Sequence, residues 1–368
     1  MSPNTRTERR KLDHIKICLE RGVQFKTVTA GFEDVHLIHR ALPEVNLREV
    51  DTTSKLLGHP LTAPIIIEAM TGGTPEAEKL NATLAEAAEK FSIGMGVGSQ
   101  RAALENPHLT QTYAIVRDKA PNAFIMANLG CSQLLKGNCL EQAEKAVEMI
   151  KADALAVHLN PLQEAVMVEG QTDFKGSLGV IKEIAQTLKS PVVAKETGAG
   201  VAAEEARLLE GAGVKAIDVG GAGGTSWSAV EYYRARSSGN ERGEQLGSTF
   251  WDWGIPTVPS LIEVRSSTNL TVIASGGIRS GIEAAKALAL GADAVGIALP
   301  LLKAAVRGRK QTFKAIQRIV EELKVAMFLA GAASVKELTE KPVVITGKTA
   351  EWLKARGFSV ESSRRIGR

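Results

Sequence analysis

The strongest constraint on the fold is an alternation of short apolar runs with amphipathic stretches that repeats along most of the chain. The runs are apolar throughout, which is typical of parallel strands buried on both faces. They number eight and lie at Ala63–Met70, Ile93–Val97, Ala123–Ala127, Ala154–Val157, Pro191–Ala194, Val214–Val219, Thr271–Ala274 and Ala294–Ala298.

The stretches between these runs have the spacing of amphipathic helices. The clearest are Glu76–Lys90, Glu141–Lys151, Leu178–Leu188, Ala202–Gly211 and Ile282–Gly291. The last two end in a glycine turn, where helices commonly stop. Eight strand–helix units in series predict an α/β fold of the (β/α)8 TIM-barrel type. An open doubly wound sheet is the alternative, and closure suits eight repeats better.

Two segments interrupt the alternation. We expect residues 1–62 to form an N-terminal extension, with an accessory hairpin at Val45–Leu57, before a barrel over 63–330 and a C-terminal tail at 331–368 that packs on it. Residues 225–257 form an insertion after the sixth strand, predicted to be a lid or a wall of the site. A subunit contact or a disordered loop is the alternative, since Arg234–Ser248 has the composition of a mobile loop. The aromatic residues of this insertion are Trp227, Tyr232, Tyr233, Phe250, Trp251 and Trp253.

Charge and cysteine content say little about partners. The 368 residues include 45 Lys and Arg against 41 Asp and Glu, a net charge of +4. Basic residues gather near both ends, either as solvated tails or as a tail that closes over an anionic substrate. They are Arg6, Arg9, Arg10, Lys11 and Lys16, and then Arg364, Arg365 and Arg368. The cysteines Cys18, Cys131 and Cys139 form no CxxC pattern, so we expect a reducing, cytoplasmic compartment. No apolar run reaches the roughly 20 residues that span a bilayer.

Polar residues crowd the points where the predicted strands end, which is where an α/β barrel carries its chemistry. The run HLNPLQE at 158–164 is the richest. In it, Glu164 could hold a hard cation, and Asn160 and Gln163 could orient a neutral group. Alone, this run could equally be a solvated strand end. Glycines in SGGIR (275–279) and GIAL (296–299) predict a phosphate site behind strands seven and eight. Lys195, after strand five, would be costly to bury without a functional partner.

With these motifs in place, the chain resembles the type 2, FMN-dependent isopentenyl-diphosphate isomerases. The resemblance runs from RKLDH at 10–14 to VVITG at 343–347. Its most specific pieces are MTGG (70–73), GSQR (98–101), HLNPLQE (158–164), GGTSW (223–227), FWDWGIPT (250–257) and SGGIR (275–279). The resemblance implies interconversion of isopentenyl and dimethylallyl diphosphate with reduced FMN and Mg²⁺. It also implies isoprenoid biosynthesis, reduction by NADPH or another donor, and a homotetramer or homo-octamer.

The resemblance assigns roles residue by residue. The implied FMN contacts are Ala69, Met70, Thr71, Ser99, Asn128, Lys195, Thr225, Gly276, Gly277, Ala298 and Leu299. The implied substrate contacts are Arg10, Lys11, Ser99, Gln100, Arg101, Asn160 and Gln163. Glu164 is the implied Mg²⁺ ligand, and Gln163, His158 and Lys195 the implied catalytic group. Arg9-Arg10 could replace Arg10-Lys11 as the basic pair, although the spacing to His14 favours the latter. Gln171 departs from the acidic residue expected after Glu169-Gly170.

The expected reaction moves a proton off one carbon and onto another, through a cationic transition state. A reduced, anionic flavin would stabilise that charge and carry the proton, while Gln163 orients or relays and Lys195 stabilises the ring. Mg²⁺ on Glu164 would bridge the diphosphate.

Two other functions are alternatives for a barrel of this kind. An FMN-dependent hydroxy-acid oxidase or dehydrogenase on the same barrel would need a His or Cys base and a carboxylate-binding Arg pair, which the strand ends do not supply. An RNA-binding barrel would need a broad basic face with interleaved aromatic residues. We therefore expect no nucleic-acid partner and no membrane association.

Overall fold

The computed structural model describes residues 6–359, with side chains from Arg9 onward. The basic residues Arg364, Arg365 and Arg368, which could have formed a substrate-covering tail, lie outside the described residues, as does the side chain of Arg6.

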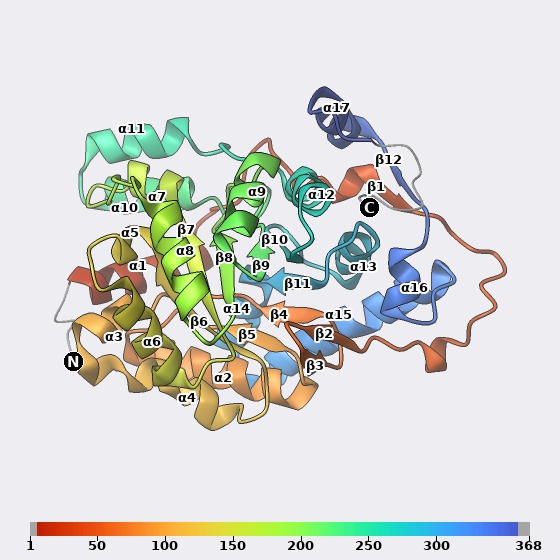
Figure 1. Cartoon of the computed structure of the whole chain (residues 1–368), viewed down its shortest axis with the longest axis horizontal. Coiled ribbons are helices and arrows are strands. Elements are labelled where there is room, and N and C mark those ends of the chain that lie inside the picture. Colours follow the sequence, from red (N-terminus) through yellow and green to blue (C-terminus); the bar gives the residue numbers. More distant parts are fainter. Residues whose placement is uncertain (1–5, 360–368) are drawn as a thin grey trace.

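Eight parallel strands close into a barrel, as predicted (Figure 1). In chain order they are β4 (Ile65–Ile67), β5 (Gly94–Gly96), β6 (Ile125–Gly130), β7 (Ala154–Leu159), β8 (Val192–Glu196), β9 (Ala216–Asp218), β10 (Thr271–Ser275) and β11 (Ala294–Ile297). Each strand pairs with the next, and β11 pairs with β4 to complete the ring. Each of the eight predicted runs overlaps a barrel strand, so the TIM-barrel prediction is confirmed and the open sheet is excluded.

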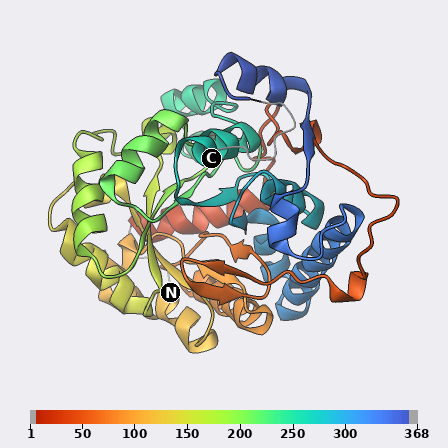
Figure 2. The same cartoon turned by 45° about the vertical axis from the view of Figure 1, so that its right-hand side comes forward.

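Helices surround the strands on the outside of the barrel (Figure 2). The five helices predicted most clearly are observed as α2 (Pro75–Phe91), α6 (Cys139–Ile150), α8 (Ser177–Thr187), α9 (Ala203–Ala212) and α13 (Gly281–Ala289). The others are α1 (Arg6–Glu20), α3 (Arg101–Glu105), α4 (Gln111–Lys119), α5 (Cys131–Leu134), α7 (Pro161–Val166), α10 (Trp227–Ser237), α11 (Glu241–Thr249), α12 (Thr257–Ser267), α14 (Leu299–Val306), α15 (Arg309–Leu329), α16 (Val335–Thr339) and α17 (Gly347–Ala355).

Local sequence explains where the best-predicted helices begin. Thr74 caps α2 by accepting a hydrogen bond from the Ala77 N–H, and Pro75 stands at the first helical position, which suits its fixed φ. Ser280 and Glu283 form a reciprocal capping box at the start of α13. The positions of these helix starts are therefore encoded within four or five residues.

The hydrophobic core has two parts. Most of it lies between the strands and the surrounding helices. A smaller cluster fills the barrel interior, where Ile66, Phe124 and Val193 pack with Leu56 and Leu61. The last two residues belong to a hairpin of β2 (Ser54–Leu56) and β3 (His59–Leu61). This hairpin closes the amino-terminal end of the barrel, opposite the strand ends that carry the polar residues.

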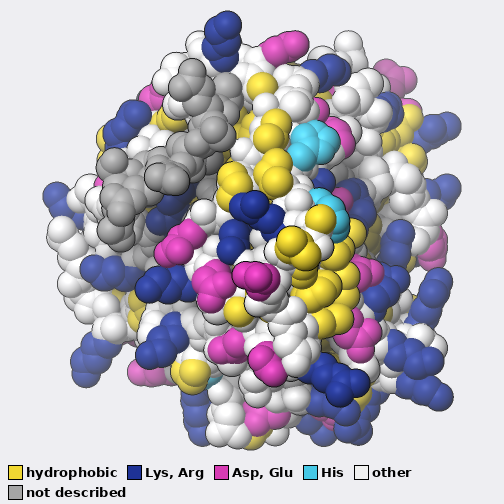
Figure 3. All heavy atoms as spheres, turned by 90° about the vertical axis from the view of Figure 1, so that its right-hand side faces the viewer, with side chains coloured by type: hydrophobic (Ala, Val, Ile, Leu, Met, Phe, Trp, Pro, Cys, Tyr) yellow, Lys and Arg dark blue, Asp and Glu magenta, His cyan; other side chains and the backbone are white. Residues whose placement is uncertain are grey.

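The N-terminal extension and the C-terminal segment pair on one side of the barrel. Strand β1 (Val35–Leu37) pairs antiparallel with β12 (Val343–Ile345). A shallow apolar groove runs between β1, α13 and α15, and hydrophobic side chains gather on this face in Figure 3. Across residues 6–359, no helix is both long and apolar enough to cross a membrane.

Two local predictions differ from the structure. The accessory hairpin was expected at Val45–Leu57, but it lies at Ser54–Leu61, because Leu56 and Leu61 are the residues that reach the barrel interior. Arg234–Ser248, whose composition indicated a mobile loop, is helical over the end of α10 and most of α11. These two helices pack against each other, which compensates for the polar composition of each.

Candidate active site

A cavity of about 670 Å³ opens at the carboxyl ends of the barrel strands. Its lining comes from the strand ends, the start of α14 and the inner face of α1. The described structure places these predicted residues on its wall: Arg10, Lys11, Ala69, Met70, Thr71, Ser99, Arg101, Asn128, His158, Asn160, Gln163, Glu164, Lys195, Thr225, Gly276, Gly277, Ala298 and Leu299. The tertiary structure thus brings together residues separated by up to nearly three hundred positions.

Gln100 is the predicted site residue that the cavity does not include among the described residues. Its side chain is fully buried, its Nε2 donates to the Ala146 carbonyl at 2.8 Å, and its Oε1 accepts from the Asn128 N–H at 2.9 Å. Both ends of the amide are therefore used by backbone. The side-chain amide of Gln100 therefore holds the strand end that presents Asn128 and is not free to bind a ligand, while a contact of Gln100 with substrate stays a prediction.

Lys195 stands in the inner part of the cavity, between two carboxylates. Its Nζ lies 2.8 Å from Glu68 Oε2 and 2.6 Å from Asp218 Oδ2. Burial alone would lower the pKa of Lys195, but Asp218 and Glu68 raise it above its usual value, so the side chain is a permanent cation. Burial and then the neighbouring Asp218 raise the pKa of Glu68 to about 7, against the opposing effect of Lys195.

His158 is held as a neutral imidazole. Its Nδ1 faces Asn128 Oδ1 at 2.8 Å, and Asn128 in turn donates to the Val97 carbonyl at 3.0 Å. Burial lowers the pKa of His158 to about 4, with smaller contributions from Lys195, Lys11 and Arg10. Because an amide oxygen accepts from Nδ1, that nitrogen carries the hydrogen and Nε2 is left as an acceptor.

Asn160 and Gln163 belong to a connected polar network on the next wall. Asn160 Nδ2 donates to Gln163 Oε1 at 3.2 Å and to Glu164 Oε1 at 3.1 Å. Gln163 Nε2 donates to Glu231 Oε1 at 2.9 Å, and His14 Nε2 lies 3.0 Å from the same oxygen. Burial would raise the pKa of Glu231, but His14 and Arg234 lower it to about 2. Gln163 is therefore fixed with its nitrogen toward a permanent carboxylate.

Three cations converge at the outer rim of the cavity. Arg10 and Lys11 come from α1, Arg101 from the start of α3, and the exposed Arg9 does not line the cavity. Lys11 Nζ donates to the Ser99 carbonyl at 2.6 Å and also contacts the Tyr113 hydroxyl. Burial and then repulsion from Arg10 lower the pKa of Lys11 to about 7. Burial also lowers the pKa of Arg10, followed by repulsion from Arg101. Such mutual repulsion is relieved when an anion binds.

The glycine-rich turns after β10 and β11 form the opposite end of the cavity. Gly276 and Gly277 have φ of 102° and 75°, and a Cβ on Gly276 would lie 2.1 Å from the Gly221 carbonyl oxygen. Helix α14 begins here, and its N-cap Ala298 has no side-chain cap. Uncapped N–H groups at a helix start suit a phosphate. The buried hydroxyl of Thr71 also has no hydrogen-bond partner within the described residues, which suits a ligand that supplies one.

Glu164 is the carboxylate of the HLNPLQE motif that could bind a cation. Glu164 Oε2 accepts from the Gln171 N–H at 2.6 Å, and the buried Asn160 Oδ1 nearby has no hydrogen-bond partner in the described structure. Within the described part of the chain, no group of three or more His, Cys, Asp or Glu side chains could hold a metal. Glu164 thus suits a hard cation whose other ligands come from the substrate and from water.

The Gln171 side chain reaches the cation cluster. With its amide oxygen facing Lys136 Nζ at 2.8 Å and Arg101 Nη1 at 3.2 Å, its nitrogen donates to the Ser132 carbonyl at 3.1 Å. A carboxylate here would neutralise part of the Arg101 charge. The neutral amide leaves that charge available to a ligand.

Sequence reasoning missed three buried carboxylates, Glu68, Asp218 and Glu231. Each has less than 5% of its surface exposed and pairs with a predicted site residue or with His14. A signal existed for the first two, because a carboxylate within or just after an apolar strand is costly unless it is paired. Glu231 carried no such signal, since it lies inside a polar helix of the insertion.

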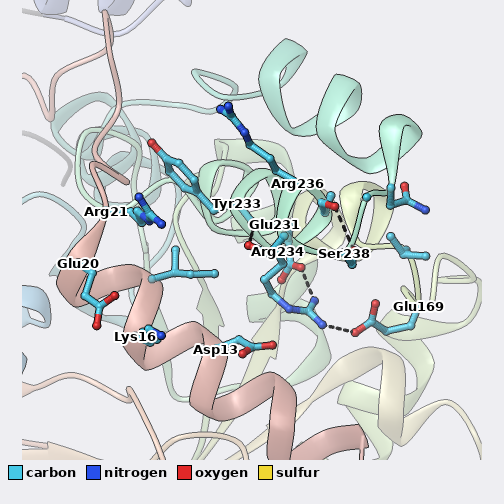
Figure 4. Close-up of a pocket in the computed structure, with 16 residues that line it drawn as sticks. Asp13, Lys16, Glu20, Arg21, Glu169, Glu231, Tyr233, Arg234, Arg236 and Ser238 are labelled. Carbon is cyan, nitrogen blue, oxygen red and sulfur yellow. Dashed lines mark hydrogen bonds and ion pairs between the residues drawn. The ribbon is translucent and has the colours of Figure 1, made fainter.

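A second cavity, of about 980 Å³, lies outside the barrel mouth between α1 and α10 (Figure 4). Arg234 Nη1 lies 2.5 Å from Glu231 Oε2, and Arg234 Nη2 lies 2.6 Å from Glu169 Oε1. The other charged residues that line this second cavity are of both signs and are more exposed. The strand-end cavity, not this one, holds the predicted catalytic residues.

Comparison with known proteins agrees with the barrel fold. The family model of the FMN-dependent dehydrogenases matches residues 4–108 and 116–345. Among solved structures, a flavocytochrome b2 mutant with pyruvate bound has a TM-score of 0.65 at 21% identity, covering 95% of this chain and 86% of that one. Mandelate oxidase with (S)-2-phenylpropionate has a TM-score of 0.61 at 19% identity, covering 92% and 97%. At these identities the likeness concerns the fold. The chain belongs to the FMN-dependent dehydrogenase family, and FMN is its cofactor.

Curated relatives narrow this assignment. Isopentenyl-diphosphate delta-isomerase of Methanosarcina barkeri is 51% identical over 355 residues, covering 96% of both chains. The proteins of the same name from Methanothermobacter thermautotrophicus and Pyrococcus furiosus are 51% and 52% identical, covering 97% of this chain and 98% and 91% of theirs. The chain belongs to the isopentenyl-diphosphate delta-isomerase family, of the FMN-dependent type.

Proposed function

We propose that this chain interconverts isopentenyl diphosphate and dimethylallyl diphosphate in the strand-end cavity, as a step of isoprenoid biosynthesis. The observation that carries the proposal is the convergence of Arg10, Lys11 and Arg101 at the cavity rim, with the pKa values of Arg10 and Lys11 lowered by burial and by the neighbouring charges. Charge-assisted contacts to a diphosphate would relieve this repulsion. The hydrocarbon part of the substrate would then extend inward, toward Gln163 and Lys195.

FMN, when bound in its reduced form, would supply a negative ring and a proton carrier beside the substrate. Gly276, Gly277 and the start of α14 would hold its phosphate, and Lys195 would face the ring from β8. Lys195 is buried, so water screens its charge little.

Gln163 would orient the reacting carbon or relay a proton. Its Nε2 is engaged by Glu231, and its Oε1 by Asn160, so the amide cannot rotate freely. Glu231, the carboxylate that holds this amide, stays ionised because His14 and Arg234 hold its pKa at about 2, so it is a weak acceptor for a proton relayed through Gln163. His158 would contribute a neutral acceptor nitrogen on the adjoining wall.

Glu164 would hold Mg²⁺ against the diphosphate. One carboxylate plus substrate oxygens and waters matches the way Mg²⁺ usually binds with phosphate ligands. Asn160 Oδ1, buried without a partner among the described residues, lies on the same network and could accept from a metal-bound water.

The alternative of a hydroxy-acid oxidase is less well supported by the site. An oxidase of that type needs a base that becomes a stable cation during the reaction. His158 faces an amide rather than a carboxylate, and burial and nearby cations hold its pKa at about 4. An imidazolium would therefore be disfavoured here.

Further parts of the proposal concern the cellular setting. We infer a cytoplasmic enzyme, reduced by NADPH or another donor, that assembles as a homotetramer or homo-octamer. Residues 1–62 would act as an extension that supplies Arg10 and Lys11, residues 63–330 as the catalytic barrel, and residues 331–368 as a tail packed on it. The insertion at 225–257 would form a wall of the site, because Thr225 and Trp227 line the cavity. Its action as a lid is a further part of the proposal.

The test uses the holoenzyme under reducing conditions. The protein reconstituted with FMN and reduced by dithionite should convert isopentenyl diphosphate, as followed by proton NMR, without stoichiometric consumption of reductant. A flavin analogue with carbon in place of the central-ring nitrogen should fill the site but abolish turnover. Turnover near the FMN rate with that analogue would show that a side chain carries the proton.

A further inference from the structure

The innermost charges of the cavity do not balance. Glu68 follows β4 and Asp218 ends β9, and both contact the ammonium group of Lys195 on β8, at 2.8 and 2.6 Å. The three side chains are 4%, 0% and 8% exposed, so water compensates little of their charge. With all three ionised, the cluster carries one negative charge in excess beside the proposed flavin site. Two carboxylates that share one cation in a buried place are the usual setting for a retained proton.

The hydrogen bonds indicate which carboxylate carries that proton. Asp218 Oδ1 accepts from the Ser275 hydroxyl on β10, so both of its oxygens have donors. Glu68 Oε2 accepts from Lys195 and, at 3.3 Å, from the Ala69 N–H. Glu68 Oε1 is buried with no hydrogen-bond partner among the described residues, and it lies where a Cβ on Gly296 of β11 would be. An anion is better stabilised at Asp218, so the proton belongs on Glu68.

Among Lys195, Asp218, His158 and Glu68, Glu68 is the residue whose charge can change near neutral pH. Its pKa is raised to about 7 by burial and by Asp218. The pKa of Lys195 is raised and that of His158 on β7 is lowered to about 4, so neither changes its protonation near pH 7. Lys195 is thus a fixed cation, and Glu68 is the adjustable group next to it.

We propose that Glu68 takes up one proton when the bound flavin is reduced. This inference rests on the proposed function, since it requires FMN in the cavity. Oxidised FMN gains two electrons and one proton to give the anionic reduced ring, and the electrons come from an added donor such as dithionite. The new negative charge lies near Lys195, where it competes with Glu68 and Asp218 for that cation. A second proton from solvent then neutralises the Glu68 carboxylate, so the total uptake is two protons per two electrons. Glu68 is a positioning residue that acts through Lys195.

The proposal predicts the pH dependence of the flavin midpoint potential. For a two-electron couple, each proton taken up adds about 30 mV per pH unit. The wild-type holoenzyme should therefore show a slope of about 59 mV per pH unit just above pH 7, and Glu68→Gln a slope of about 30 mV. Asp218→Asn, which removes the repulsion that favours protonation of Glu68, should also lower the slope and provides a second variant.

Glu196 offers a matched control. It is a buried glutamate next to Lys195 in sequence, with a pKa also raised to about 7 by burial. Its Oε2 accepts from the N–H groups of Gly198 and Gly200, at 2.5 and 3.2 Å, and it is outside the cavity lining described above. Glu196→Gln should therefore keep the wild-type slope. Equal slopes in the wild type and Glu68→Gln would overturn the proposal.

Two spectroscopic readouts separate the possible proton sites. The visible spectrum of the reduced flavin should not change over the same pH range, because a second proton on the ring would alter it and would overturn the assignment to Glu68. In the apoprotein, Glu68 and Glu196 should both contribute to the infrared band of protonated carboxyl groups that is lost as pH rises through about 7. Glu68→Gln should remove the Glu68 component and leave that of Glu196, and a band of undiminished intensity in Glu68→Gln would overturn the assignment whether or not flavin binds. Failure of the wild-type protein to bind FMN would instead contradict the proposed function, and with it the proton uptake by Glu68 on flavin reduction.

Discussion

Glu164 shows how much of this site depends on one side chain. Its carboxylate is positioned by Asn160 and the Gln171 N–H, yet it is the one predicted metal ligand. We expect Glu164→Gln to raise the Mg²⁺ concentration needed for half-maximal activity by roughly tenfold or more. Even the loss of a residue that only hydrogen-bonds a metal ligand typically weakens metal binding by about that factor, and loss of the ligand itself should weaken it at least as much. Flavin absorbance of the purified variant should remain that of the wild type. A Mg²⁺ titration of activity checks this.

The control for that prediction is Glu169→Gln. Glu169 is a neighbour in sequence whose carboxylate pairs with Arg234 at 2.6 Å, on the outer cavity. Its Mg²⁺ titration should match the wild type. An unchanged titration for Glu164→Gln would remove Glu164 from the metal-binding role.

Lys11 is the residue whose charge should depend most on the ligand. Its pKa of about 7 lies below the ordinary value of 10.5, so the folded apoprotein should gain stability as pH rises from 7 toward 10.5. The sign follows because the unfolded chain binds more protons in that window. Inorganic diphosphate should raise the pKa of Lys11, with uptake of about one proton per site near pH 8. Calorimetry in two buffers of different ionisation enthalpy measures this uptake.

Two variants make the Lys11 prediction specific. Lys11→Met should lower the proton uptake by close to the full amount, whereas Lys16→Met should retain it. Lys16 lies on the same helix but is exposed on the outer cavity. Equal proton uptake in all three proteins would show that diphosphate does not bind at Lys11.

At the scale of elements, helix α1 is the part of the chain that completes the site from outside the barrel. Deletion of residues 1–11 removes Arg10 and Lys11, and charge-assisted bonds contribute roughly 1.5–3 kcal/mol each. We expect kcat/KM to fall by roughly two orders of magnitude or more, mainly through KM, while FMN stays bound. Steady-state kinetics of the reduced holoenzyme tests this.

A shorter deletion, of residues 1–8, leaves both basic residues in place and should keep kcat/KM close to the wild-type value. If the longer deletion had no kinetic effect, the basic segment would be a solvated tail, as its composition alone allowed. The same pair of deletions, followed by thermal unfolding, separates loss of the ligand contacts from loss of stability.

At the scale of the whole molecule, helix α17 and the residue that follows it contact the barrel through a buried carboxylate. Glu263 on α12 is fully buried and accepts from Trp352 at 3.0 Å and from Arg356 at 2.9 and 3.1 Å. Burial would raise the pKa of Glu263, but Arg356 and Trp352 lower it below its usual value. The stability from this contact is therefore present above the ordinary pKa of glutamate and is lost as pH falls through the folded pKa.

Arg356→Ala should accordingly lower the thermal midpoint at neutral pH, and as pH falls below 4.5 the midpoint should drop less than in the wild type. Thermal unfolding over a pH series measures both effects. Lys145→Ala is the control, since Lys145 pairs with Glu141 in an exposed contact that should contribute little. A midpoint for Arg356→Ala equal to that of the control would show that α17 docks without this contact.

The arrangement of strands and helices was predictable because its signals are local. A strand buried on both faces is apolar throughout, and a helix start is encoded by a cap such as Thr74 or Ser280 within a few residues. The same locality made the strand-end motifs visible, and the resemblance then assigned them roles. Most of the residues assigned to the site line one cavity, because the carboxyl ends of parallel strands meet at one end of a barrel.

The amino-acid sequence by itself therefore determined the barrel, the motifs at its mouth and the family. The tertiary structure alone decided which side chains meet there. In the folded chain the side chain of Gln100 bonds to backbone outside the cavity, and Lys195 pairs with Glu68 and Asp218. The segment Arg234–Ser248, whose composition indicated a mobile loop, lies mostly in α10 and α11. Such contacts join residues far apart in sequence, and their geometry depends on barrel closure and on the direction of each side chain, which no local pattern encodes.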